Sequence, residues 1–171
     1  MGKKKSLNLM GIVFLCVAVV ALVLAIVGMV TPALIAKDLP IVGDVNVKLF
    51  GNDEKVFNWE NITKATKASP TLSIVGFIVA IVGALVVVCH LVLKLFVGKD
   101  IKILGICGGV VALVGGVLVL VGGIVMASNL NTLGGTVDNT KMYSLAIGTI
   151  LGLISGIVGA AAGVVSSVLV K

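Results

Sequence analysis

His90 and Lys94 are the residues of this sequence whose types and spacing come closest to a chemical site. Residues four apart share one face of a helix, so an imidazole and an amine would stand one turn apart. Such a pair can bind a proton or a ligand. Its place at the end of an apolar run favours an interfacial histidine beside a lysine that extends to the headgroup region. No apolar run contains an acid, which argues against a cation-coupled transporter or a rotor ring, since both need a carboxylate at mid-depth.

The three cysteines, Cys16, Cys89 and Cys107, are dispersed and accompanied by a single histidine. This is not the spacing of a metal site, and the thiols are expected to be buried as small hydrophobic groups. S-acylation of Cys89 or Cys107 is the alternative. Ser155 lacks the flanking residues of a nucleophile motif, and no phosphate-binding or dinucleotide fingerprint is present. We therefore expect no enzyme activity, no catalytic residues, no cofactor and no metal.

The composition is that of a membrane protein. The chain has 171 residues, of which 59% are hydrophobic and 12% charged, with a formal net charge of +6. All thirteen basic residues are lysines. The absence of arginine argues against a nucleic-acid partner, because arginine is the usual bidentate ligand of bases and phosphates.

Four apolar runs exceed the ~18 residues that indicate a membrane span. We predict one four-span domain over residues 1–171, with the lipid bilayer as its surroundings. The predicted spans are residues 7–30, 72–93, 103–127 and 143–170, and the predicted outer loops are residues 31–71 and 128–142.

Lysines predict the orientation of the spans. The cluster Lys3 to Lys5 precedes the first span, and a short lysine-bearing connection follows the second. Lysine-rich segments stay in the cytoplasm. We therefore predict a plasma or cytoplasmic membrane protein with both termini cytoplasmic. Two modifications stay open, namely lipidation at Gly2 and glycosylation of Asn61 if the loop is extracellular in a eukaryote.

The first outer loop has β character. Residues 44–50 alternate polar and apolar side chains, residues 51–54 are typical of a turn, and residues 55–59 fit a returning strand. We predict a small extracellular β-hairpin, with Phe57 and Trp59 as outer contact residues.

Regularly spaced glycines predict how the spans pack. The segment from Gly108 to Ser128 repeats one heptad three times, each opened by two glycines. Small residues let helix backbones approach closely in lipid, and a strict seven-residue repeat favours left-handed coiling. We predict a left-handed four-helix transmembrane bundle. The residues expected to pack helices are Gly108, Gly109, Gly115, Gly116, Gly122, Gly123, Gly148, Gly152, Gly156, Gly159 and Gly163.

The layout of four spans, inner termini, a larger first outer loop with β character and a small second loop resembles the claudin-like tetraspan proteins. The resemblance covers the whole chain and rests on layout. Claudins pair loop tryptophans with two cysteines, whereas here Trp59 is alone and the loop has no cysteine. The disulfide and the pore carboxylates of that family are therefore not expected.

Three functions fit these features. The first is a non-enzymatic membrane protein that self-associates through its glycine-rich faces and outer hairpin, in a structural, adhesion or assembly role. The second is a subunit of an oligomeric pore or channel. The third is an accessory or immunity-type protein bound to a larger membrane complex. The expected partner is accordingly a second copy of the chain or another membrane protein.

Overall fold

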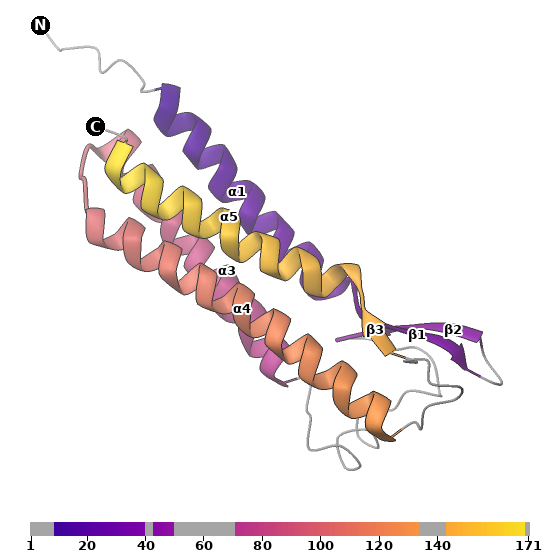
Figure 1. The fold of residues 1–171 in the computed structure, drawn as a ribbon. Coiled ribbons are helices and arrows are strands. Elements are labelled where there is room, and N and C mark those ends of the chain that lie inside the picture. Colours follow the sequence, from indigo (N-terminus) through magenta and orange to yellow (C-terminus); the bar gives the residue numbers. More distant parts are fainter. Residues whose placement is uncertain (1–8, 40–42, 50–70, 134–142, 170–171) are drawn as a thin grey trace, which may run out of the picture.

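The computed structural model describes residues 9–39, 43–49, 71–133 and 143–169. Four long helices form a bundle with a small sheet at one end (Figure 1). The helices are α1 (Leu9–Val30), α3 (Thr71–Val92), α4 (Lys102–Leu133) and α5 (Ile147–Leu169), and a five-residue π-helix, η1 (Leu93–Val97), continues α3.

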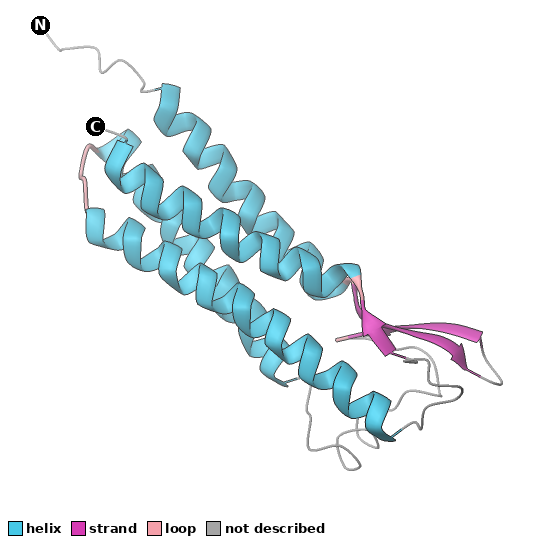
Figure 2. Ribbon diagram, viewed as in Figure 1, coloured by secondary structure: helices cyan, strands magenta, loops and turns pink. Residues whose placement is uncertain are grey.

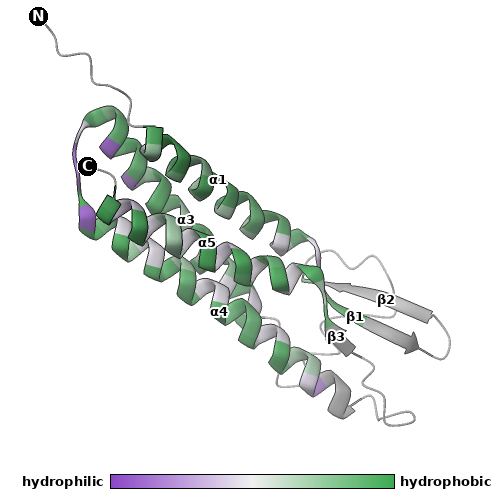
Figure 3. Ribbon diagram, turned by 45° about the horizontal axis from the view of Figure 1, so that its top comes forward, coloured by the Kyte–Doolittle hydropathy of each residue, from purple (hydrophilic) through white to green (hydrophobic). Residues whose placement is uncertain are grey.

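All four helices are long and apolar enough to cross a membrane. The 22 residues of α1 rise by about 1.5 Å each, which matches a hydrocarbon core of about 30 Å. Hydrophobic residues cover the helices along their length, and the hydrophilic colour gathers near the connection that follows η1 (Figure 3). Large aliphatic side chains point outward on every helix. The chain is an integral membrane protein.

The helices are neighbours in a closed order. α4 packs most extensively against α3 and α5, and α1 packs against α5 and α3. The start of α1, the end of α5 and the connection between η1 and α4 lie at one end of the bundle (Figure 1). The sheet lies at the opposite end.

The sheet has three antiparallel strands in the order β2-β1-β3 (Figure 2). They are β1 (Pro32–Leu39), β2 (Gly43–Lys48) and β3 (Tyr143–Leu145). β1 follows α1 directly and pairs on both sides. Its partner β3 leads into α5, and the amide of Ala146 donates to the carbonyl of Ala33 over 2.9 Å.

An apolar cluster joins the sheet to the helices. Leu34 of β1 and Phe77 of α3 are fully buried there, with Val119 and Met126 of α4. Elsewhere small residues fill much of the interior, which allows the helices to approach closely.

The structure adds a strand pairing that was not predicted. The segment that begins at Gly43 pairs with β1, while residues 55–59, its predicted hairpin partner, lie outside the described residues, so the hairpin stays a prediction. The alternation of polar and apolar residues predicted β2. It did not predict β1, because the sequence of β1 is largely apolar and shows no such alternation.

Two boundaries of the spans also differ. Tyr143 to Leu145 form a strand, so the last helix begins at Ile147 and not at Tyr143. α4 continues to Leu133, beyond the predicted end at Ala127 and into the expected outer loop. At the predicted end, Met126 and Ala127 lie in the apolar cluster beneath the sheet, and the helix continues past them.

Candidate functional site: the helix contacts and the polar end

The first glycine of each pair in α4 lies against α3. A Cβ atom placed on Gly115 would lie 2.6 Å from Ala80 Cα and 2.7 Å from the carbonyl oxygen of Gly76. Such distances are below those of real Cβ contacts, so a larger residue would force the two backbones apart. The neighbouring heptads repeat the relation, with Gly108 against Val87 and Gly122 against Ser73.

The second glycine of each pair lies against α5. A Cβ atom on Gly116 would lie 2.9 Å from Gly156 Cα and 3.1 Å from the carbonyl oxygen of Gly152. The flanking heptads place Gly109 against Ala160 and Gly123 against Thr149. One repeat therefore provides two contact faces, because adjacent residues of a helix point in directions about 100° apart.

The glycines of α5 meet three different neighbours. A Cβ on Gly148 would lie 2.8 Å from the carbonyl oxygen of Gly28 in α1, and one on Gly152 would lie 2.8 Å from Phe77 Cε1. The other three face α4, where Gly156 meets Gly116, Gly159 meets Ala112 and Gly163 meets Gly109. All eleven glycines singled out in the sequence are buried within one chain.

Sequence reasoning gave less weight to the glycines of α3. A Cβ on Gly76 would lie 2.6 Å from the amide nitrogen of Val119, and one on Gly83 would lie 2.7 Å from Ala112 Cα. Their spacing of seven matches that of the glycine pairs in α4, and this match was the signal that could have placed them at the same interface.

Hydroxyl groups of α5 tie it to the start of the chain. Ser155 Oγ donates to the carbonyl oxygen of Ala21 in α1 over 2.8 Å, and Thr149 Oγ1 donates to that of Ala33 in β1 over 3.0 Å. Both hydroxyls are buried. A buried hydroxyl needs a partner, because its desolvation otherwise costs free energy.

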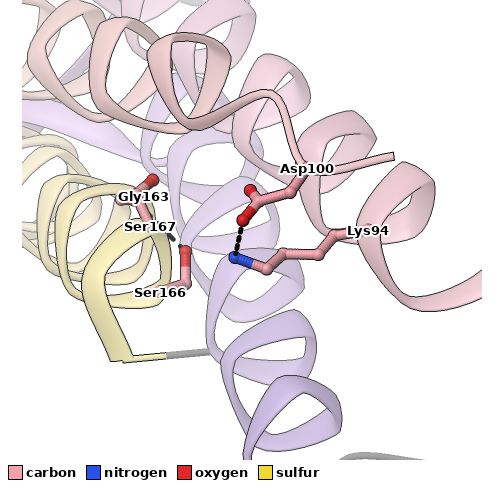
Figure 4. Close-up of polar contacts among 5 residues, drawn as sticks. All are labelled: Lys94, Asp100, Gly163, Ser166 and Ser167. Atoms are coloured by element: carbon pink, nitrogen blue, oxygen red, sulfur yellow. Dashed lines mark hydrogen bonds and ion pairs between the residues drawn. The ribbon is translucent and has the colours of Figure 1, made fainter. Parts of the chain in front are cut away.

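Polar side chains gather at the end of the bundle opposite the sheet, and we call this group the polar end. Its members are His90, Lys94, Asp100, Ser166 and Ser167. Lys94 Nζ lies 3.0 Å from Asp100 Oδ2, while Ser166 and Ser167 donate to the carbonyl oxygen of their own helix at Gly163 (Figure 4).

The backbone explains the ion pair. η1 carries Lys94, and Gly98 ends it with a φ of 74°, in the left-handed region that favours glycine. The chain then turns back, so that Asp100 lies over Lys94, whose side chain is only 6% exposed. The lysine therefore does not extend to the surroundings as the sequence suggested, because a carboxylate is available within the fold.

His90 is also placed differently from the interfacial histidine that the sequence suggested. Its side chain is fully buried. A Cβ on Gly105 of α4 would lie 2.8 Å from His90 Nε2 and would overlap Ser167 Oγ. The imidazole and the hydroxyl therefore meet at Gly105, a contact that the sequence could not indicate, because it joins three helices.

The expectation of buried cysteines was wrong. Cys16, Cys89 and Cys107 are free thiols exposed on the surface of the bundle. Glycine, alanine and serine occupy the interior instead, since the close helix contacts leave little room for a larger side chain. Over the described ranges, no three His, Cys, Asp or Glu residues lie together as metal ligands would.

The predicted outer contact residues Phe57 and Trp59 lie outside the described residues, as do Gly2 and Asn61. Comparison with known proteins finds no family model that matches the chain and no curated protein significantly similar to it.

Proposed function

We propose that the chain is a non-enzymatic integral membrane protein that acts by association, with a left-handed, glycine-packed bundle as the scaffold and the sheet as the contact surface. The partner is a second copy of the chain. A claudin-like layout, with the sheet outside the cell and both termini inside, belongs to this proposal.

The observation that carries the proposal is the sheet itself. Among the described strands, β2 has a partner on one side only, because the order is β2-β1-β3. An edge strand presents unpaired N–H and C=O groups, which can pair with a strand of another chain. The short β3 offers only three residues, so β2 is the better edge.

The glycines have a different role in this proposal. Those of α4 and α5 contact helices of their own chain, so they hold the scaffold together and leave association to the sheet. The same close contacts argue against an aqueous path through one bundle. A pore would therefore need several copies around a central space.

Two proline variants of β2 test the proposal. Val45 and Asn46 are adjacent in the strand, and adjacent residues direct their N–H groups to opposite edges of a sheet. Proline removes the N–H at its position. One variant therefore blocks the free edge and the other weakens the pairing with β1, which makes each the control for the other.

We expect the protein to form oligomers in nanodiscs, measured by light scattering, and one of the two variants to be monomeric with unchanged thermal stability. A monomeric wild-type protein would contradict self-association and favour the accessory function. A ring of defined size that survives both prolines would contradict the sheet contact and favour a pore subunit.

A further inference from the structure

We propose that His90 is a proton-binding site, and that its protonation separates Lys94 from Asp100 and loosens the polar end of the bundle. The proposal is independent of the association described above. It rests on the burial of the imidazole, its contacts and the charges around it.

The imidazole is buried with little compensation. Its side chain is fully buried, and neither ring nitrogen meets hydrogen-bond geometry with a described residue, although the backbone of Ile101 and the carboxylate of Asp100 are near it. A neutral imidazole has one donor and one acceptor, whereas the protonated ring has two donors and a charge. Burying an unpaired charge costs far more than burying the neutral ring. The closed arrangement therefore fits the neutral form.

The surroundings of His90 hold one cation and one anion. Lys94 stands one turn further along the chain, and its Nζ atom lies 3.0 Å from Asp100 Oδ2 in a geometry outside that of a hydrogen bond. No other charged side chain faces the ring from the described parts of α1, α4 and α5. Among the described residues, the remaining ionisable groups at this end are all exposed, namely Cys16, Cys89, Lys99, Lys102 and Cys107.

A proton on His90 changes the charge balance of this end. Two cations, His90 and Lys94, then share Asp100, and because both are covered by the protein they repel each other more strongly than they would in water. The ring lies directly against Gly105 of α4, since a Cβ there would lie 2.7 Å from His90 Cδ2.

The connection after η1 is the part of the polar end that can move when His90 is protonated. Asp100 is 35% exposed, so its carboxylate is in contact with the surroundings while Lys94 is covered. Residues 98–101 lie between two helical segments and outside both. Protonation is therefore expected to move this connection and η1 outward, which exposes both cations to water.

The single histidine of the chain makes the test direct. The full chain is labelled with ¹⁵N-histidine and placed in nanodiscs, so that every imidazole signal comes from His90. We expect the signal to titrate as the pH is lowered to 5. Hydrogen exchange of residues 93–105, corrected for its intrinsic pH dependence, should accelerate in parallel, by up to about tenfold per pH unit for one coupled proton.

His90→Gln is the matched variant, because it keeps a polar side chain and removes the titration. Its exchange in residues 93–105 should be independent of pH after the same correction. A ring that stays neutral down to pH 5 would overturn the proposal. Equal pH dependence in the wild type and the variant would also overturn it, and the wild-type titration decides the question if the variant fails to fold.

Discussion

At the scale of the residue, the helices approach one another most closely where glycines lie. A Cβ on Gly115 would clash with the backbone of α3, and one on Gly116 would lie 2.9 Å from Gly156 Cα of α5. In lipid there is little hydrophobic drive to bring helices together, so dispersion contacts between closely approaching backbones have greater weight. The neighbour on the outer side, Val114, is 48% exposed and contributes to the lipid-facing surface instead.

Gly115→Leu and Val114→Leu form a matched pair that tests this account. Both place leucine on the same turn of α4, one against Ala80 and the other outward. We expect Gly115→Leu to lower the stability of the bundle by about 1–3 kcal/mol, the usual cost of overpacking, and Val114→Leu to leave it nearly unchanged. Thermal unfolding in detergent measures both, and equal midpoints would contradict the packing role of the glycines.

The sequence showed that the glycines are regularly spaced, but it could not show which neighbouring helix each row of glycines contacts. A seven-residue repeat indicates that a stripe packs, without saying which neighbour it meets. That Gly115 faces α3 while Gly116 faces α5 depends on the order of the helices in space. The burial of His90 was hidden for the same reason, since its covering residues come from α4 and α5.

At the scale of the element, the four apolar helices follow from length and hydropathy, while the strands follow from tertiary contacts. α1 ends at Val30, the predicted end of the first span, and Pro32 begins β1. β3 has only three residues and no alternation of its own, so nothing local distinguishes it from the start of a helix. Its pairing with β1 and the hydrogen bond from Thr149 to Ala33 explain its conformation.

Leu34 and Ile35 provide a test of how β1 is attached. Leu34 is fully buried among Phe77 and Met126, whereas Ile35 is half-buried on the other face of the strand. We expect Leu34→Ala to cost about 2–5 kcal/mol, as large-to-small changes in a core do, and Ile35→Ala to cost less.

Hydrogen exchange locates the effect of these two variants. In Leu34→Ala the amides of residues 32–39 should exchange faster, while those in the middle of α4 and α5 stay protected. Uniform loss of protection across the helices would show that the sheet cluster supports the whole bundle and not the strand alone.

At the scale of the whole molecule, the two ends have different chemistry. One end holds the sheet, with an apolar cluster beneath it, and the other holds the ion pair and the buried histidine. The lysines near the first span and in the connection after η1 suggest that the polar end faces the cytoplasm, and this orientation is part of our proposal.

Cysteine labelling tests the orientation. In a variant with Cys16, Cys89 and Cys107 replaced by alanine, a new cysteine is introduced at Ser6 or at Asn61. An impermeant maleimide added to intact cells should label Asn61→Cys at once and Ser6→Cys only after permeabilisation. The reverse pattern would place the sheet in the cytoplasm and contradict the lysine rule for this chain.

The central position of β1 has a consequence for biogenesis. One of its neighbours lies a few residues downstream, and the other, β3, immediately precedes the last membrane helix. During synthesis the first helix can insert long before that second neighbour leaves the ribosome. The N–H and C=O groups on the β3 side of β1 therefore stay without their strand partner until almost the entire chain has been translated. Until then they form hydrogen bonds with water or with a chaperone. The sheet is thus completed only when the final transmembrane segment arrives, and a truncated product would leave one edge of β1 unpaired with β3.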